Sequence, residues 1–487
     1  MKPSRWITGG LGLLFLLAAI WNLRAAQQGL RVIRVPESQP PMTFILPENA
    51  NPATRPLVLI GHGLAGSSQV MRGFALTLAH AGYVTAIWDF DGHGANPQPL
   101  SSTSSSGSLL ANAEAVLAEA ERRGLGAPGQ VAILGHSMGS GVALSFGQAH
   151  PETSATIAVS PVDVSVTPAL PRNLLLMAGS FEGNFVQNAE ALLAEAGGAG
   201  GDPAAGTGRK LVVIPGVEHV SILFKPQAHQ TARQWLDAVF GPQPGAQDYV
   251  DLRIFWFGLG VLGTVLVSAA WIPSAAPEPA STSSLGRRLL AIVAGALGAT
   301  LLLGAAGLAG LRLPQLFGVL VGGYLLLWFG AAGVIALLLL KPHWSKPSGK
   351  AIWTGLLVFA ALWLGFGLLG NQVWLPWLLI PRRLVLWPVG AILLLPWFLA
   401  MGEVSSAAKP LGRVAWWALH SLVLVGSMLV ALQLSQGLYF ILLILPLFPL
   451  ILGLHALATI LQCDRWTLGL SGALFVSWML LAVFPLQ

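Results

Sequence analysis

The sequence predicts two kinds of structure in one chain: an α/β domain with a mostly parallel sheet and flanking helices, and an all-α transmembrane helical bundle. Of the 487 residues, 54% are hydrophobic and only 9% are charged, whereas soluble globular chains carry roughly 25% charged residues. Of the 20 acidic residues, only Glu278, Glu403 and Asp464 lie beyond Asp251. This composition excludes an ordinary soluble enzyme and a disordered chain.

The first element is an apolar run over residues 6–23, which follows the basic residues Lys2 and Arg5. A run of about 18 residues is long enough to cross most of a ~30 Å hydrocarbon core. A cleaved signal peptide is the alternative, but no clear cleavage motif follows the run. We therefore expect residues 1–26 to form a signal-anchor transmembrane helix, with its N-terminus inside and the next domain outside.

Residues 27–250 alternate short apolar runs with amphipathic stretches, as is typical of an α/β domain. Strands are expected at Leu30–Arg34, Met42–Leu46, Leu57–Ile60, Val84–Trp88, Val131–Leu134, Ala155–Val159, Leu174–Met177 and Leu211–Ile214. Helices are expected at Gly73–Ala81, Leu109–Arg123, Gly141–Ala149, Val186–Ala196 and Pro226–Phe240. The first two strands predict an antiparallel hairpin ahead of a parallel sheet, and Ser101–Ser108 and Gly197–Gly208 predict surface loops.

Residues 251–487 form a series of long apolar runs, which predict a transmembrane bundle of about eight helices. They are expected near Ile254–Ile272, Leu289–Leu311, Phe317–Leu340, Ala351–Gly370, Leu384–Val404, Val414–Leu434, Leu438–Ile460 and Trp466–Phe484. Most basic residues of the connecting segments fall on one side, which we assign to the cytoplasm. The chain is thus expected to be a multi-pass protein of the plasma or inner membrane, with its α/β domain on the extracytoplasmic side.

Charge and cysteine content exclude several partners. The net charge of +6 does not predict a nucleic-acid partner, because the basic residues lie between apolar runs, where they orient helices. The single Cys463 cannot form an internal disulfide or a cysteine metal cluster, and we expect a structural thiol.

The main chemical signal is Gly135-His136-Ser137-Met138-Gly139, which fits G-x-S-x-G between an expected strand and an expected helix. The motif alone is weak evidence, because a chain with 57 glycines can contain it by chance. Its position between a strand and a helix makes it stronger evidence. A serine on such a tight turn projects above the sheet, near the free N–H groups of the following helix. Ser137 is therefore the candidate nucleophile.

A serine hydroxyl becomes nucleophilic when a histidine takes its proton and a carboxylate orients that histidine. His219 follows the last expected strand, so its side chain can lie over the carboxyl edge of the sheet, whereas His150 and His229 belong to helices. Glu182 follows the preceding strand and is the expected acid. Asp163, one strand earlier, remains a competitor.

The oxyanion of such a reaction needs fixed hydrogen-bond donors. One is expected from the backbone N–H of Met138, next to the nucleophile. The other is expected from Leu64 in the loop Gly61–Gly66, which follows the third expected strand. His62 is expected to shape this loop.

These motifs carry a resemblance. The motifs are, in chain order, His62-Gly63, Asp89-Phe90-Asp91-Gly92-His93-Gly94, the serine motif and Val217-Glu218-His219. The order of these motifs resembles that of the α/β-hydrolase superfamily, in particular of small dienelactone-hydrolase and esterase/lipase-like serine hydrolases. The resemblance covers about Leu57 to Phe240 and says nothing of the bundle. It implies an α/β-hydrolase fold and a catalytic triad of Ser137, His219 and Glu182, with Glu where Asp is commoner.

The expected function is therefore a membrane-anchored serine hydrolase that cleaves a carboxylic ester, lipophilic or lipid-derived, through an acyl-enzyme. No cofactor and no metal are expected, the partners are the substrate and membrane lipid, and the oligomeric state is not predicted. The alternatives are an acyltransferase, thioesterase or amidase on the same triad, or a membrane transporter with a non-catalytic α/β sensing domain.

Two further expectations concern other segments. Gly61-x-Gly63-x-x-Gly66 with Asp89 downstream also fits a dinucleotide-binding fingerprint, although a histidine inside the glycine turn is unusual for it. The loop Trp374–Trp377, with Arg382 and Arg383 after it, is expected at the membrane interface, either as an aromatic belt or as a surface that presents acyl chains.

Overall fold

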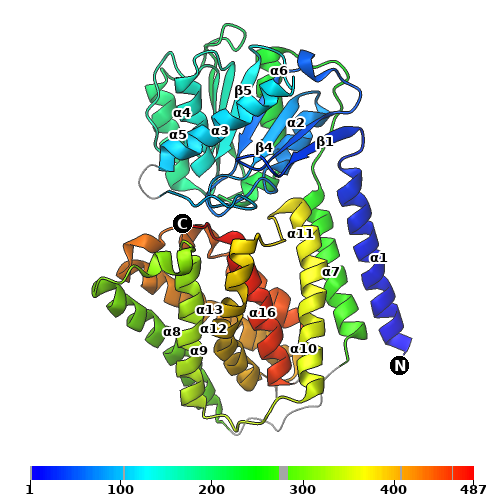
Figure 1. Ribbon diagram of the computed structural model, residues 1–487, viewed down its shortest axis with the longest axis vertical. Coiled ribbons are helices and arrows are strands. Elements are labelled where there is room, and N and C mark those ends of the chain that lie inside the picture. Colours follow the sequence, from blue (N-terminus) through cyan, green and yellow to red (C-terminus); the bar gives the residue numbers. More distant parts are fainter. Residues whose placement is uncertain (1–2, 102–104, 274–282, 406–407, 463) are drawn as a thin grey trace.

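The computed structural model describes residues 3–101, 105–273, 283–405, 408–462 and 464–487, so Cys463 lies outside the described residues. An α/β domain lies at one end of a helical bundle (Figure 1). Helix α1 (Pro3–Ala25) leads into the α/β domain, and α7 (Arg253–Trp271) leads out of it. An α/β domain and a helical bundle, as predicted from composition, are both present.

The α/β domain contains one eight-stranded sheet in the order β1-β2-β4-β3-β5-β6-β7-β8. Strand β1 pairs antiparallel with β2, and β2 pairs antiparallel with β4, whereas all the other pairs are parallel. The predicted hairpin ahead of a parallel sheet is therefore present. The strands are β1 (Leu30–Val35), β2 (Met42–Pro47), β3 (Leu57–Gly61), β4 (Val84–Trp88), β5 (Val131–His136), β6 (Ala155–Val159), β7 (Leu174–Gly179) and β8 (Arg209–Ile214).

Helices cover both faces of the sheet, so its central strands are buried except at Val131, the first residue of β5. In β3, Val58 belongs to the core that contains Phe74, whereas Leu59 belongs to the core that contains Phe146, as expected when successive side chains alternate between faces. The helices of the domain are α2 (Arg72–His80), α3 (Ser105–Arg122), α4 (Met138–Ala149), α5 (Gly183–Glu195) and α6 (Pro226–Phe240).

One predicted loop is partly wrong. Of the serine-rich stretch Ser101–Ser108, the residues from Ser105 onward belong to α3. Serine is favoured at helix starts as well as in loops, because its hydroxyl bonds to free backbone groups in both places. Serine content therefore does not distinguish the two.

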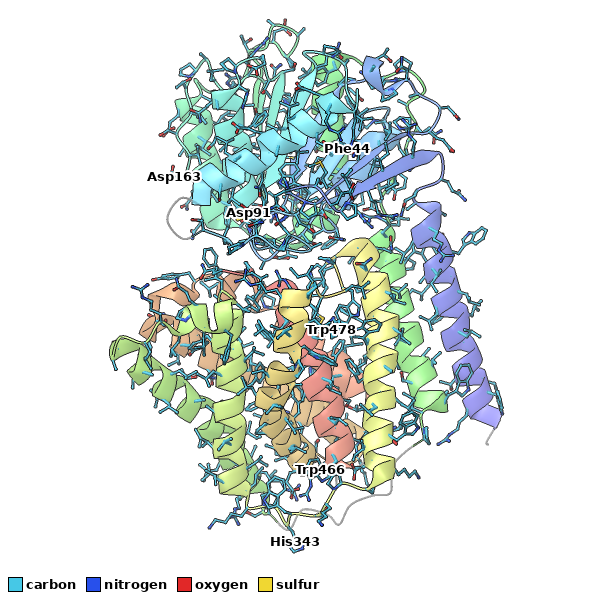
Figure 2. All side chains as sticks on the ribbon, viewed as in Figure 1. Phe44, Asp91, Asp163, His343, Trp466 and Trp478 are labelled. Atoms are coloured by element: carbon cyan, nitrogen blue, oxygen red, sulfur yellow. The ribbon has the colours of Figure 1, made fainter. Side chains whose placement is uncertain are left out.

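Within the described residues, eight helices are long and apolar enough to cross a membrane. Besides α1 and α7 these are α8 (Leu285–Leu308), α9 (Gly322–Leu340), the run of α10 (Gly349–Leu362) and α11 (Leu368–Val373), α12 (Pro381–Ser405), α13 (Pro410–Leu434) and α16 (Arg465–Val483). In Figure 2, Trp478 lies inside the bundle, and Trp466 lies at the end remote from the α/β domain. The chain is consistent with a membrane protein.

The long helix predicted at Leu438–Ile460 is wrong. This segment is divided into a short 3₁₀ turn (Gln436–Leu438), α14 (Ile441–Ile444) and α15 (Leu447–Ala458). Proline lacks the N–H that an internal helical residue donates, and Pro446 and Pro449 together start a new helix. Helix α12 nevertheless continues through Pro388 and Pro396, so neighbouring packing decides whether a proline ends a helix.

The two connections between the α/β domain and the bundle lie together. Helices α1 and α7 are side by side in Figure 1, and a Cβ atom on Gly12 would lie 2.8 Å from the carbonyl oxygen of Gly263. At their domain ends, the His80 ring bonds to the carbonyl oxygen of Ala26 at 3.1 Å, and the His80 carbonyl accepts from the N–H of Gln247 at 2.8 Å. One residue thus joins the incoming and outgoing segments.

The carboxyl edge of the sheet faces the bundle. In the loop after β3, Ser67 donates to the carbonyl oxygen of Trp374 at 3.1 Å. In the loop after β4, the carbonyl oxygen of Gly92 accepts from Arg383 at 2.7 Å and from the N–H of Leu486 at 2.8 Å. Catalytic groups of parallel sheets gather at this edge, so the bundle lies against the face where a site is expected.

The expectation of a loop at the membrane interface is wrong for Trp377 and Arg383. Trp377 is fully buried, and Arg383 is 1% exposed. Trp374 is only half-buried. The loop and the start of α12 fill the contact between the α/β domain and the bundle, which local composition could not indicate.

We expect Arg383→Met to lower the free energy of unfolding by about 3 kcal/mol, since it removes charge-assisted hydrogen bonds to three buried carbonyl groups. These belong to Leu481, Phe484 and Gly92. Thermal unfolding of the detergent-solubilised chain measures the effect. The matched control is Arg382→Met, because Arg382 is the exposed neighbour; an equal loss in both variants would contradict the assignment.

Candidate active site

Ser137 occupies the turn between β5 and α4, with φ 52° and ψ −118°. This strained conformation for a residue with a side chain is a feature of functional turns. Both flanking glycines are required by space: a Cβ atom on Gly135 would lie 1.8 Å from the carbonyl oxygen of Gly139, and one on Gly139 would lie 2.6 Å from that of His62. The local sequence therefore holds the serine in place.

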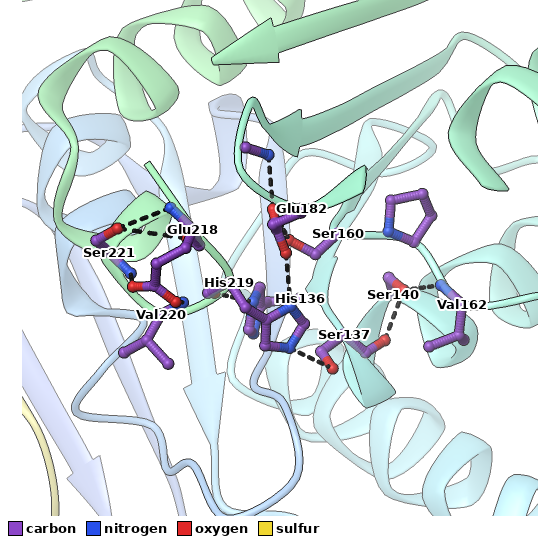
Figure 3. A network of polar contacts seen from close by, with 12 residues as sticks. His136, Ser137, Ser140, Ser160, Val162, Glu182, Glu218, His219, Val220 and Ser221 are labelled. Atoms are coloured by element: carbon purple, nitrogen blue, oxygen red, sulfur yellow. Dashed lines mark hydrogen bonds and ion pairs between the residues drawn. The ribbon is translucent and has the colours of Figure 1, made fainter. Parts of the chain in front are cut away.

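Ser137, His219 and Glu182 form one hydrogen-bonded chain (Figure 3). Nε2 of His219 lies 3.0 Å from Oγ of Ser137, and Nδ1 lies 2.6 Å from Oε1 of Glu182. All three residues are buried. With Nδ1 donating to the carboxylate, Nε2 is left to accept the serine proton.

Glu182 is held by two more donors. Its Oε2 accepts from Oγ of Ser160 at 2.9 Å and from the backbone N–H of Gly179 at 2.6 Å. Sequence reasoning missed both residues. Ser160 follows β6 directly, so its position at the carboxyl edge is the signal that could have indicated it.

The other candidates lie elsewhere. Asp163 is exposed at the periphery of the α/β domain (Figure 2). His150 lies 3.2 Å from both Glu152 and Glu114 at the surface. His229 is buried and bonds to the carbonyl oxygen of Leu223. The structure therefore brings Glu182, and not Asp163, to His219.

His136 fixes the backbone of the histidine loop. Its Nε2 lies 2.9 Å from the carbonyl oxygen of His219. Burial lowers the pKa of His136 well below its usual value, so the ring is neutral and donates from Nε2. On another side, the ring of Phe185 stacks on that of His219, with centroids 4.5 Å apart. Together they limit the motion of the His219 ring.

The expected oxyanion donors lie on two adjoining turns. Among the described residues, the backbone N–H groups of Leu64 and Met138 have no hydrogen-bond acceptor. The loop of Leu64 lies against the serine turn, because a Cβ atom on Gly63 would be 3.1 Å from Cβ of Ser137. Both N–H groups thus remain free at the turns that flank the serine.

His62 has a structural part in this loop. Its Nδ1 lies 2.7 Å from the carbonyl oxygen of Gly63, and its Nε2 accepts from the N–H of Phe90 at 3.1 Å. Burial lowers its pKa. A neutral ring with both nitrogens engaged shapes the loop, as the sequence analysis expects.

The carboxylate of Asp89 argues against the dinucleotide interpretation. Its two oxygens accept from the N–H groups of Ser68 at 2.7 Å and Ala95 at 2.9 Å. In a dinucleotide-binding domain this carboxylate would bind a ribose hydroxyl, whereas here it joins two loops of the protein.

Comparison with known proteins supports the fold. Residues 52–205, roughly a third of the chain, match the family model described as serine aminopeptidase, S33. This match and the sheet order together indicate an α/β-hydrolase fold for the α/β domain. No curated protein is significantly similar to the chain.

Among the solved structures similar to this chain are a dienelactone hydrolase, a monoglyceride lipase and an esterase/lipase. A dienelactone hydrolase from Anabaena variabilis is 19% identical, with 43% of this chain and 97% of that chain covered and a TM-score of 0.31. A soluble variant of the monoglyceride lipase of Saccharomyces cerevisiae is 15% identical, with 42% and 94% covered and a TM-score of 0.32. An esterase/lipase from an uncultured bacterium is 16% identical, with 43% and 84% covered and a TM-score of 0.32.

Proposed function

We propose that this chain is a membrane-anchored serine hydrolase that cleaves a carboxylic ester. The observation that carries the proposal is the hydrogen-bonded chain from Ser137 through His219 to Glu182, with distances of 3.0 Å and 2.6 Å. The match to a serine-hydrolase family model supports the same reaction class. An amidase or thioesterase would use the same groups, so the ester is the finer part of the proposal.

The first half of the reaction forms an acyl-enzyme. Oγ of Ser137 attacks the ester carbonyl carbon while Nε2 of His219 takes the hydroxyl proton. The carbonyl oxygen becomes an oxyanion that the N–H groups of Leu64 and Met138 bind, and each such donor contributes roughly 10²- to 10³-fold in rate. His219 then protonates the departing alkoxide, and the C–O bond breaks to release the alcohol.

The second half regenerates the enzyme. A water molecule attacks the acyl carbon while His219 takes one of its protons, and the proton then returns to Oγ of Ser137 as the carboxylic acid leaves. Ser160 and Gly179 hold the carboxylate of Glu182 in place by two hydrogen bonds, and this carboxylate stabilises the imidazolium of His219. The nucleophile, the base, the acid and the oxyanion donors of this cycle are all supplied by the chain, and the ester and water are the substrates.

The substrate is proposed to be lipophilic, and the α/β domain to lie on the extracytoplasmic side. Support for the first comes from the contacts of the loops after β3 and β4 with the bundle, through Trp374 and Leu486. These contacts hold the carboxyl edge of the sheet close to the apolar helices. Support for the second comes from the excess of basic residues in the segments at the opposite end of the bundle.

An activity-based fluorophosphonate probe tests the proposal on the full chain in detergent or vesicles. We expect the probe to label Ser137, because it reacts with activated serines, and we expect matched ester substrates to be cleaved faster than amides and thioesters. Mass spectrometry of the labelled peptide identifies the serine. Absence of labelling in folded protein would contradict a serine hydrolase, whereas faster amide cleavage would replace the ester with an amide.

A further inference from the structure

A large apolar groove lies between α7 and α15, where the bundle meets the α/β domain. Its volume is about 600 Å³. Ile254, Phe257 and Val265 of α7 form one wall, and Leu450 and Leu454 of α15 form the facing wall. The described residues that line it are aliphatic, aromatic, proline or glycine. Of its two tryptophans, Trp417 already donates its indole N–H to the carbonyl oxygen of Pro449. The lining is therefore predominantly apolar and favours a hydrocarbon.

The length of the groove follows from the part of α7 that lines it. Residues 254 to 265 of α7 line it, and at 1.5 Å per residue this is a length of about 17 Å. Its direction follows α7, which runs away from the α/β domain (Figure 1). An extended acyl chain would fit a groove that is elongated along one helix.

The groove is open on the side that would face lipid. Leu262 is 46% exposed on α7, and Leu450 and Leu457 on α15 are 66% and 49% exposed. All three line the groove and belong to the apolar helical part of the chain. A chain in the bilayer could therefore enter from the side without crossing water.

One end of the groove lies beside the loop that carries His219. Val220 and Phe224 line the groove from the α/β domain, and Val220 is the residue after His219 (Figure 3). Trp374 also lines it, and its carbonyl oxygen accepts from Ser67 in the loop that also holds Leu64. The groove and the triad thus share the histidine loop.

We infer that the groove binds the acyl chain of the ester substrate, which enters laterally from the bilayer and places its carbonyl at Ser137. This inference rests on the proposed function and adds the substrate class: a long-chain acyl ester of a membrane lipid. The chain passes from one apolar environment to another, so its preference for the groove comes from van der Waals contacts with the lining, which become more numerous as the chain lengthens. The rate is therefore expected to rise with chain length until the groove is filled.

Gly258→Phe tests the inference, because Gly258 lines the groove and a Cβ atom there meets nothing within 4 Å. The ring fills space that an acyl chain would occupy. We expect kcat/KM for a palmitoyl ester to fall at least about tenfold relative to that for an acetyl ester of the same alcohol. Val265→Phe lies deeper, about 10 Å further along α7, and is expected to affect the palmitoyl ester more than the octanoyl ester.

The matched control is Gly426→Phe on α13. Gly426 is exposed, a Cβ atom there also meets nothing within 4 Å, and it does not line the groove. We expect the ratio of palmitoyl to acetyl kcat/KM to stay at the wild-type value. An equal fall of that ratio in both glycine variants would overturn the inference, since it would indicate a general effect of the added ring.

A short-chain fluorophosphonate separates failure of this inference from failure of the proposed function. If Ser137 is labelled and acetyl ester is cleaved in Gly258→Phe with an unchanged preference for palmitoyl ester, the groove holds only a structural lipid and the inference is wrong. If wild-type protein is not labelled by any probe, the proposed function itself is wrong. If Gly258→Phe is labelled at Ser137 but has lost the preference for palmitoyl ester, the result supports both the proposed function and the role of the groove.

Discussion

Ser137→Ala is expected to lower ester hydrolysis by about 10⁴-fold or more, because the remaining groups cannot form an acyl-enzyme. Among the described residues, Oγ of Ser137 is the hydroxyl that lies within reach of Nε2 of His219, at 3.0 Å, and a water molecule in its place would react far more slowly. Initial rates with a chromogenic ester and labelling by a fluorophosphonate measure the loss. Both signals are expected to disappear together.

Ser154→Ala is the control for the serine substitution. Its hydroxyl bonds to the carbonyl oxygen of Gly129, in the loop before β5 and therefore at the opposite edge of the sheet from Ser137. We expect wild-type hydrolysis from this variant. If Ser137→Ala abolishes labelling but the cellular function of the chain persists, the bundle is the working part and the transporter interpretation replaces the hydrolase.

Glu182→Gln is expected to lower kcat by roughly 10³- to 10⁴-fold without unfolding the protein. Ser160 and Gly179 both donate to Oε2, so they would keep the amide oxygen on their side and direct the amide NH₂ toward Nδ1 of His219. Nδ1 would then accept a hydrogen bond, and the proton would move to Nε2. A protonated Nε2 cannot take the proton of Ser137, so the side chain keeps its shape and loses its function.

Asp163→Asn is the matched control, because Asp163 is the competing carboxylate from sequence and is exposed. It is expected to keep the wild-type kcat. Steady-state kinetics of both variants decide between the two acids: a large loss for Asp163→Asn with little change for Glu182→Gln would exchange their assignments.

The strands and the serine turn of the α/β domain could be predicted because each is encoded by a short stretch of sequence. Strands such as Leu57–Gly61 are continuous apolar runs, and the serine turn is recognisable from its glycines. Three parallel strands place the residues that follow them at one edge, and this was sufficient to bring Ser137, Glu182 and His219 into one group. Ser160 also follows a strand, and this position is its signal, but it was missed because no flanking motif distinguishes it from other residues at strand ends.

The arrangement of the bundle against the α/β domain was not accessible, because its contacts join residues far apart in the chain. Ser67 and Trp374 are 307 residues apart, and Arg383 and Gly92 are 291 apart. Neither pair has a local signature. The division of residues 438–460 was also missed, because a proline within an apolar run can either kink a helix or end it, and the sequence alone does not distinguish the two outcomes.

The meeting of both connections at His80, with Ala26 on one side and Gln247 on the other, has a consequence for how the protein is made. Because a chain is synthesised from its N-terminus, α1 is complete before its partner α7, and the whole α/β domain is produced between them. Because the domain begins and ends at one point, it can complete its own fold as a closed unit before α7 arrives, and the late pairing of the two helices then joins it to the rest of the protein.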